Sequence, residues 1–365
     1  MSTTAETTSE PDRPDPRSLP STLLGMDREE LCRMAENLGF PAYRGTQIHH
    51  WLYRRTVREI GQMTNLPAAL RETLRDRAGG TDTVGAHPPV SVNESSDGTR
   101  KYLFPTAHGG FVESALIPEG KRITLCLSTQ VGCRRSCTFC QTARQGFQGN
   151  LQAGEILNQY HSIPERERIT NIVYMGMGEP LDNWENGLRS LRIFTDPEGY
   201  ALAARRITLS TVGIHPQLEH FLRADTKGPV SLAISLHTPF PEERRRLMPV
   251  ENANPIEETV RLIRELRADR ERRISFEYTM FSGFNDTQRH VDGIARLLNG
   301  LRFRINLIPF HQIEGVDLRP TSPEEIEAFA ERLRRKDIPT FIRRSRGQDI
   351  NAACGLLWTR HVQQG

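Results

Sequence analysis

The sequence contains no apolar run that approaches the roughly 20 residues that a helix needs to cross a bilayer. We therefore expect no membrane association. Residues 1–21 are polar, contain several prolines and lack the apolar segment of a secretory signal. We predict that they form a disordered leader.

Cysteine is scarce, with six residues in a chain of 365, yet three of the six lie close together. Clustering of this kind without an export signal excludes the disulfide framework of a small secreted protein. It predicts a reducing, cytoplasmic location.

Lysine is scarcer still. Of 48 basic residues only Lys101, Lys121, Lys227 and Lys336 are lysines, and the net charge is +3. Arginine suits bidentate contacts with phosphate, but a GC-rich coding sequence would give the same bias. Charge alone therefore leaves an RNA partner open.

Alternating strand and helix patterns dominate the chain from residue 121. Six apolar segments, RITLCLS, ITNIVYMGM, RRITLSTVG, GPVSLAISLH, RISFEYTMF and FRINLIPF, are separated by helical segments. This alternation predicts parallel pairing with crossover helices, and six strands predict an α/β fold, a partial (β/α)6 TIM-like barrel. Residues 121–358 would form this barrel, with its chemistry at the carboxyl ends of the strands.

Two smaller units precede the predicted barrel. Residues 22–82 carry helical patterns and predict an N-terminal accessory domain with basic and aromatic groups that could contact RNA. Residues 83–120 read as strands, with Asp97-Gly98 as the hairpin turn. Alternation places Glu113 and Ala115 on one face of the last strand, where Glu113 is most simply a solvated residue.

Cys133, Cys137 and Cys140 form a C-x₃-C-x₂-C cluster, with Cys126 seven residues upstream. Three thiolates on a four-iron cluster leave one iron without a protein ligand. A structural zinc site normally has four protein ligands, and Cys126 could supply the fourth. The spacing favours an iron–sulfur cluster and leaves zinc as an alternative.

Polar residues gather where the predicted strands end. Glu179 lies in the glycine-rich turn GMGEP, and Ser210 and His237 end later strands. Period-two alternation also places Cys126 on a polar face of the first barrel strand. These positions predict a lumen that binds a ligand.

The cluster spacing, with Phe139 before the last cysteine, resembles that of radical S-adenosylmethionine (SAM) enzymes. Seven segments in order resemble the RlmN/Cfr family of radical rRNA methyltransferases over about residues 22–358: LCLSTQVGC, CTFCQTARQGF, YMGMGEPLDN, RITLSTVG, LAISLH, INLIPF and RGQDINAACG. The segment after INLIPF, residues 311–321, departs from the family pattern.

The resemblance implies methylation of carbon 2 of adenine in 23S rRNA, in the peptidyl-transferase region, and in tRNA, at the adenosine 3′ of the anticodon. It implies a 4Fe-4S cluster on Cys133, Cys137 and Cys140, and two SAM molecules per turnover. The residues implied to contact SAM are Gly178, Glu179, Ser210, Ser235, Leu236, His237 and Asn306.

The resemblance also implies roles for three residues outside the cluster. Cys354 would carry the methyl group as S-methylcysteine, Cys126 would resolve the protein–RNA adduct through a transient disulfide with Cys354, and Glu113 would accept the adenine proton. The implied partners are the RNA substrates and an electron donor of the flavodoxin or ferredoxin type. We expect a monomer.

Two alternatives remain at this point. The first is methylation of adenine carbon 8, the Cfr-type activity, which the same cysteines would serve. The second is a non-catalytic RNA-binding protein with a structural zinc ion closed by Cys126.

Overall fold

The computed structural model of the chain describes residues 22–223, 230–267 and 274–358. The predicted disordered leader, residues 1–21, lies outside the described residues. Within the described part, no helix is long and apolar enough to cross a membrane.

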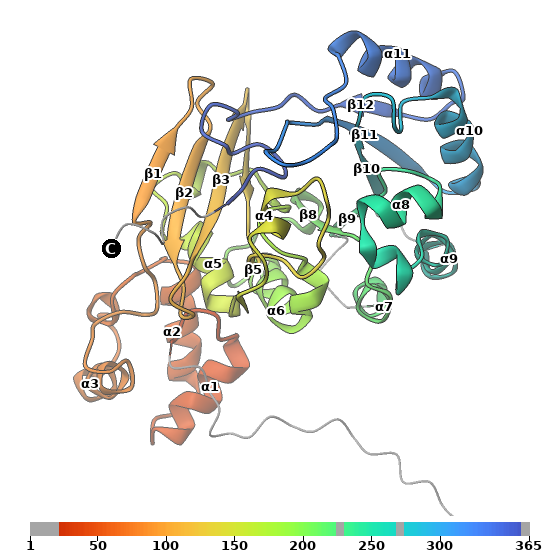
Figure 1. Cartoon of the computed structure of the whole chain (residues 1–365). Coiled ribbons are helices and arrows are strands. Elements are labelled where there is room, and N and C mark those ends of the chain that lie inside the picture. Colours follow the sequence, from red (N-terminus) through yellow and green to blue (C-terminus); the bar gives the residue numbers. More distant parts are fainter. Residues whose placement is uncertain (1–21, 224–229, 268–273, 359–365) are drawn as a thin grey trace, which may run out of the picture.

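A single ten-stranded sheet organises the molecule (Figure 1), in the order β1-β2-β3-β4-β7-β8-β9-β10-β11-β12. From β4 onward all neighbouring strands are parallel. The sheet order has two ends, so the barrel is partial, as predicted. The six predicted strands are β4 (Arg122–Cys126), β7 (Asn171–Tyr174), β8 (Ile207–Thr211), β9 (Ser231–Ser235), β10 (Ile274–Met280) and β11 (Phe303–Pro309).

A seventh parallel strand, β12 (Thr340–Ile342), pairs with β11 and was not predicted. It has three residues, and Phe341 at its centre is exposed, so it carries no buried apolar run that the sequence could reveal.

Helices follow the strands and complete the parallel crossovers. They are α5 (Ala153–His161), α6 (Trp184–Thr195), α7 (His215–Arg223), α8 (Pro241–Leu247), α9 (Ile256–Arg267), α10 (Gln288–Leu297) and α11 (Pro323–Arg334). Helix α11 begins with a capping box, in which the Ser322 hydroxyl accepts from the Glu325 amide at 3.2 Å and the Glu325 carboxylate accepts from the Ser322 amide at 3.0 Å.

Three antiparallel strands extend the sheet beyond β4. They are β1 (Ser91–Glu94), β2 (Arg100–Pro105) and β3 (Phe111–Glu119). The predicted turn joins β1 and β2, where Gly98 has φ +81° and Asp97 accepts from the Thr99 amide at 2.9 Å. In the β3–β4 register, Ala115 faces Cys126.

The N-terminal unit is helical, as predicted, with α1 (Arg28–Asn37), α2 (Tyr43–Tyr53), the 3-10 helix η2 (Ile60–Gln62) and α3 (Ala68–Arg77). Helices α1 and α2 approach closely at Gly45, where an added Cβ would lie 2.3 Å from the Cys32 amide nitrogen. This unit lies at the opposite end of the molecule from α8 in Figure 1.

Candidate active site

The three clustered cysteines lie on a tight loop between β5 (Gln130–Val131) and α4 (Gln141–Arg144), which we call the cluster loop. Gly132 begins the loop with φ +73°, and a Cβ there would lie 1.6 Å from the Gly146 carbonyl oxygen. Only glycine fits this approach. The Thr138 amide donates to the Leu247 carbonyl at 2.9 Å and holds the outer side of the loop.

Cys133, Cys137 and Cys140 line one cavity at the carboxyl ends of the strands. Burial raises the pKa of the Cys133 thiol to about 12 and raises the pKa of the other two thiols as well. Thiolates are disfavoured there without a compensating positive charge. The three thiols therefore suit an iron–sulfur core, whose binding would release their protons.

Within the described residues, no group of three or more His, Cys, Asp or Glu could hold a metal ion. A mononuclear zinc site needs all its sulfurs about 2.3 Å from one ion. In a four-iron cluster each cysteine binds a different iron, so its sulfurs lie further apart. Three cysteines in one loop match the number of protein ligands that leaves one iron of a four-iron cluster open.

Arg135 fixes the cluster loop to the neighbouring strand end. Its guanidinium forms a bidentate ion pair with Asp182 of the 3-10 helix η4 (Pro180–Asn183), with Nε 2.5 Å from one carboxylate oxygen. Because η4 follows the GMGEP turn directly, this pair couples the cysteines to that turn.

Gly178 and Glu179 shape the side of the cavity beside the cluster loop. Gly178 has φ +96°, and an added Cβ would lie 2.5 Å from the Gln130 Cβ. Each carboxylate oxygen of the buried Glu179 accepts one amide, from Leu181 at 3.0 Å and from Val212 at 2.9 Å. Burial raises the pKa of Glu179 to about 7, so a cation beside it would favour its ionised form.

His237 is held as a neutral donor. Its Nδ1 accepts from the Thr279 amide at 2.9 Å, which assigns the proton to Nε2. Burial, aided by Arg244, lowers the pKa of His237 to about 3. Its backbone is left-handed, with φ +59°, and the Asn285 amide group donates to its carbonyl at 2.7 Å.

Most of the residues expected to contact SAM line the cavity, and two do not. Gly178, Glu179, Ser210, Ser235 and His237 are part of its wall. Leu236 and Asn306 are absent from that wall. The Leu236 side chain is buried in the hydrophobic core.

Asn306 acts instead on Glu277, a wall residue that the sequence reasoning missed. Asn306 donates to Oε1 of Glu277 at 2.7 Å, and Ser275 donates to the same oxygen at 2.9 Å. Oε2 is buried and has no hydrogen-bond partner among the described residues, with Arg343 Nε 3.5 Å away. An acidic residue within the apolar run RISFEYTMF was the signal that could have revealed it.

These features fit SAM. The Oε2 atom of Glu277 pairs with the Arg343 charge but accepts no hydrogen bond from the described residues, so it can accept one from a hydroxyl donor such as a ribose, and Glu179 can pair with an ammonium group. In the GMGEP turn, Gly176 and Gly178 line the cavity without side chains, so a ligand can reach their backbone atoms. Phe139 packs edge-on against His237 with ring centroids 4.7 Å apart and adds an apolar surface.

Cys126 packs with Ala352, in the segment that carries Cys354, although the two cysteines are far apart in the sequence. Cys126 is buried beside Ala115 and Ala352, whereas Cys354 is exposed on the cavity wall. Burial and then the nearby Cys354 sulfur raise the pKa of Cys126 to about 12. The positive charge of Arg343 favours the thiolate forms, so it lowers the pKa of both thiols and partly offsets the effect of burial. Sequence reasoning did not single out Arg343.

Backbone contacts hold the segment that carries Cys354. The Gln141 amide donates to the Gly355 carbonyl at 2.8 Å, and the Thr142 hydroxyl donates to the Leu357 carbonyl at 2.7 Å. Both donors belong to α4, directly after Cys140. The cluster loop therefore positions the C-terminal cysteine.

Glu113 is buried, so its interpretation as a solvated residue was wrong. Its Oε1 lies 2.9 Å from Lys101 Nζ, and its Oε2 accepts from the Trp358 amide at 2.8 Å. Burial raises the pKa of Glu113, and the Lys101 charge opposes that rise. Glu113 contacts the segment that carries Cys354, through the Trp358 amide, and does not line the cavity.

Comparison with known proteins agrees with this arrangement. The chain matches the Radical SAM superfamily over residues 127–298 and the ribosomal RNA large subunit methyltransferase N-terminal domain over residues 21–79. It is 49% identical over 341 residues to a probable dual-specificity RNA methyltransferase RlmN of Porphyromonas gingivalis, covering 93% of this chain and 98% of the relative.

A second relative is the dual-specificity RNA methyltransferase RlmN of Halorhodospira halophila, 41% identical over 346 residues and covering 93% of this chain and 94% of the relative. A solved structure of a radical SAM methyltransferase from Sphaerobacter thermophilus matches with a TM-score of 0.86 at 39% identity. That match covers 93% of this chain and 99% of the other.

The parallel partial barrel and its cysteine loop are those of a radical SAM enzyme, a class that uses a 4Fe-4S cluster and SAM. The chain belongs to the RlmN family of RNA methyltransferases, and RNA is its substrate class. This membership confirms the predicted fold and enzyme class. It does not favour the zinc-protein or carbon 8 alternatives.

Proposed function

We propose that this enzyme methylates carbon 2 of adenine in the peptidyl-transferase region of 23S rRNA and in tRNA, at the adenosine 3′ of the anticodon. The main support is that Cys126 packs with Ala352, two residues before Cys354, and that Cys354 lines the same cavity as the three cluster cysteines. Two thiols next to a cluster site provide a carrier and a resolving group for carbon transfer to an unreactive ring carbon.

In this proposal Cys133, Cys137 and Cys140 hold the 4Fe-4S cluster, while Glu179, His237 and Glu277 contact SAM. Gly178, Ser210, Ser235, Leu236 and Asn306 complete the expected SAM site, with Asn306 acting through Glu277 and Leu236 through its backbone. When bound, the cluster and two SAM molecules per turnover supply a methyl group and a carbon-centred radical that removes hydrogen.

The chain's own residues would then carry the carbon. Cys354 holds it as a thioether, and its exposure on the cavity wall allows an adenine to approach. The Cys126 thiolate attacks the Cys354 sulfur, a disulfide forms and the bond from sulfur to carbon breaks. Arg343 assists by stabilising the thiolate.

Glu113 would take the proton from the adenine carbon. The Lys101 charge, 2.9 Å away, favours the ionised carboxylate and opposes the rise in the pKa of Glu113 that burial causes. Both Glu113 oxygens already have partners, so the Trp358 contact must open before an adenine proton can reach Oε2.

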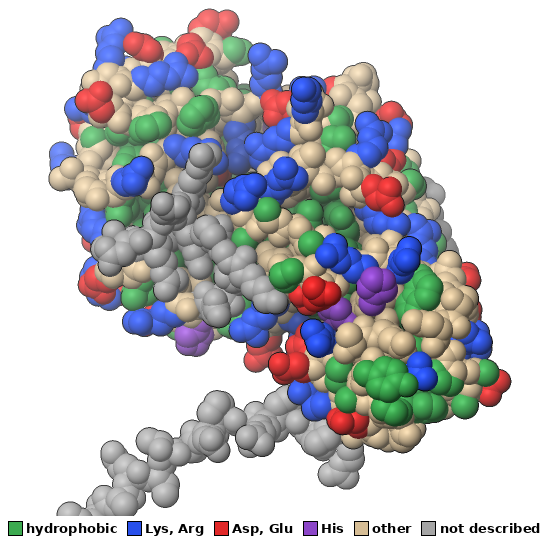
Figure 2. All heavy atoms as spheres, turned by 180° about the vertical axis from the view of Figure 1, so that it is seen from behind, with side chains coloured by type: hydrophobic (Ala, Val, Ile, Leu, Met, Phe, Trp, Pro, Cys, Tyr) green, Lys and Arg blue, Asp and Glu red, His purple; other side chains and the backbone are tan. Residues whose placement is uncertain are grey.

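RNA binding has support from charge. Exposed cations lie where the parallel strands begin, opposite the cavity, and none of them forms an ion pair with a described carboxylate: Lys121, Arg122, Arg168, Arg205, Arg206 and Arg302. Figure 2 shows many basic side chains, with acidic ones among them, on the side of the molecule opposite to that seen in Figure 1. Because the adenine must enter the cavity at the other ends of the strands, this surface can contact only phosphates of the same RNA that lie away from the reacting base. We assign residues 22–82 to RNA binding, 83–120 to a packing segment and 121–358 to the barrel.

The remaining assignments follow from the reaction. We propose a cytoplasmic location, where RNA substrates occur, and an electron donor of the flavodoxin or ferredoxin type, because the cluster needs an electron from outside the protein. We propose that it acts as a monomer, because one chain contains every group assigned above.

The test is to incubate anaerobically reconstituted enzyme with 23S rRNA fragments, tRNA and methyl-labelled SAM, and to locate the label by mass spectrometry. We expect label on carbon 2 of adenine in both RNAs, and none with Cys354→Ala. Cys32→Ala, which removes a cysteine outside the site, is the matched control. Label on carbon 8 would show that the Cfr-type alternative is correct.

A further inference from the structure

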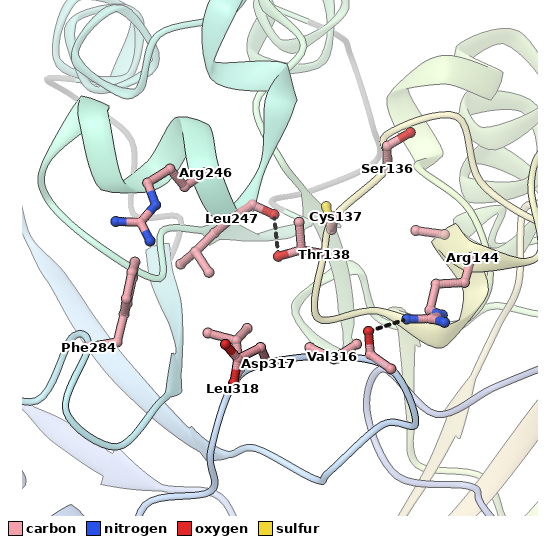
Figure 3. Close-up of a pocket in the computed structure, with 12 residues that line it drawn as sticks. Ser136, Cys137, Thr138, Arg144, Arg246, Leu247, Phe284, Val316, Asp317 and Leu318 are labelled. Atoms are coloured by element: carbon pink, nitrogen blue, oxygen red, sulfur yellow. Dashed lines mark hydrogen bonds between the residues drawn. The ribbon is translucent and has the colours of Figure 1, made fainter.

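A second cavity, of about 480 Å³, lies on the outer side of the cluster loop (Figure 3). Its walls come from the cluster loop, from α4 and α8, and from residues 315–318. We call it the outer cleft. Cys137 lines both the outer cleft and the catalytic cavity, so one cluster ligand separates the two.

The outer cleft has an apolar floor and a basic rim. Leu247, Phe284, Val316 and Leu318 supply apolar surface. Arg144 and Arg246 stand on opposite sides of the cleft (Figure 3), and Arg134 is an exposed residue of the cluster loop. An apolar centre with a charged rim is the usual anatomy of a protein–protein interface.

None of these three arginines forms an ion pair with a described carboxylate. Arg144 donates to the Gly315 carbonyl at 3.3 Å, Arg246 lies 5.5 Å from the Phe284 ring centroid, and Arg134 lies 3.9 Å from that of Phe147. Their charges remain available to an acidic partner. Asp317 is the one acidic side chain in the wall of the cleft.

We propose that the outer cleft is the docking site of an acidic electron-transfer protein that reduces the cluster. This inference rests on the proposed function, which requires an electron at the cluster. One electron leaves the partner's reduced flavin or iron–sulfur group and enters the oxidised cluster, and no bond forms or breaks. Electron transfer slows steeply with distance, so a donor should dock against a cluster ligand such as Cys137.

RNA is a less suitable occupant of this cleft. The N-terminal helical unit lies at the opposite end of the molecule from α8, which forms one wall of the cleft, and the unpaired cations described above lie at the opposite ends of the strands. A separate cleft would let the donor bind while RNA covers the catalytic cavity. Weak electron-transfer encounters bury less than about 1,200 Å², so a site of modest size is sufficient.

The test uses a bacterial flavodoxin, an acidic flavoprotein, in its hydroquinone form with the reconstituted enzyme. We compare the double variant R144E/R246E with the matched double variant R205E/R206E from the opposite strand ends. We measure flavodoxin Kd by calorimetry, cluster bleaching by stopped flow, tRNA Kd by anisotropy and methylation driven by dithionite.

R144E/R246E should weaken flavodoxin binding and slow its reduction of the cluster by roughly 10- to 100-fold, because like charges then meet across the rim. Dithionite-driven methylation and tRNA binding should not change, which separates this inference from the proposed function. Asp317→Asn should strengthen flavodoxin binding. R205E/R206E should weaken only tRNA binding.

Unchanged flavodoxin binding in R144E/R246E would overturn the docking site. Loss of tRNA binding in that variant, with flavodoxin binding intact, would also overturn it and would identify the outer cleft as an RNA surface. Failure of dithionite-driven methylation in the unmodified enzyme would count against the proposed function alone.

Discussion

Replacing Lys101 with methionine should shift the pH dependence of adduct resolution. Lys101 Nζ lies 2.9 Å from Glu113 Oε1, and both side chains are largely buried. At an effective dielectric constant of about 20, unit charges at this distance attract by roughly 6 kcal/mol before desolvation is subtracted. An opposite charge this close typically lowers a carboxyl pKa by about 1–3 units.

The direction of the shift in the pH–rate profile follows from the role of Glu113, because a proton acceptor must be ionised to act. Without Lys101, burial is opposed only by the Trp358 amide, so the pKa of Glu113 rises. The acid limb of the rate profile should move to higher pH by about 1–3 pH units, with a tenfold loss of rate per unit below the limb. Raising the pH should restore the rate.

The assay is single-turnover formation and decay of the protein–RNA adduct on denaturing gels across a range of pH. Lys101→Arg retains the charge and should behave like the unmodified enzyme. Lys336→Met removes an exposed lysine outside the cations assigned to RNA and is the matched control. The groups that perturb Cys126 do not include Lys101, so the shift would report on Glu113. An unshifted limb in folded Lys101→Met would refute this reasoning.

Three further predictions concern other residues of the site. Cys126→Ala should leave the RNA covalently attached to Cys354; release of free methylated RNA at the normal rate would exclude Cys126 as the resolving group. Glu179→Gln should weaken SAM binding roughly 10- to 100-fold in calorimetry, because a charge-assisted hydrogen bond is lost; an unchanged Kd would contradict its assigned contact. Arg244→Met should lower the free energy of unfolding by about 3–5 kcal/mol, because it leaves Glu251 buried without its ion-pair partner. In denaturant titrations Arg244→Met combined with Glu251→Met should recover part of that loss, and a double variant less stable than the single one would argue against this explanation.

The barrel strands could be predicted from sequence because each is an apolar run that ends in polar or glycine residues. The strand β12 could not, since three residues with an exposed Phe341 carry no such pattern. The turn at Asp97-Gly98 was predictable for a local reason, because a left-handed glycine suits a hairpin.

The site residues could be predicted from the sequence only where they lie in a continuous sequence motif. The cluster cysteines and Glu179 lie in continuous motifs, so their spacing was visible. Lys101 and Arg343 act through tertiary contacts, with β3 and with the Cys354 segment, and neither lies in a local pattern that reveals its partner. Glu113 appeared solvated because alternation alone cannot show that the C-terminal segment covers its face of the strand.

The most direct test of the central proposal, transfer of the carbon through Cys354, uses SAM with a fully deuterated methyl group. The methylated adenine is recovered from tRNA and analysed by mass spectrometry. Because hydrogen must be removed from the methyl group on Cys354 before the carbon reaches the ring, the product methyl on carbon 2 should have lost one deuterium. A product methyl with all of its deuterium retained would mean direct transfer from SAM and would contradict the proposal.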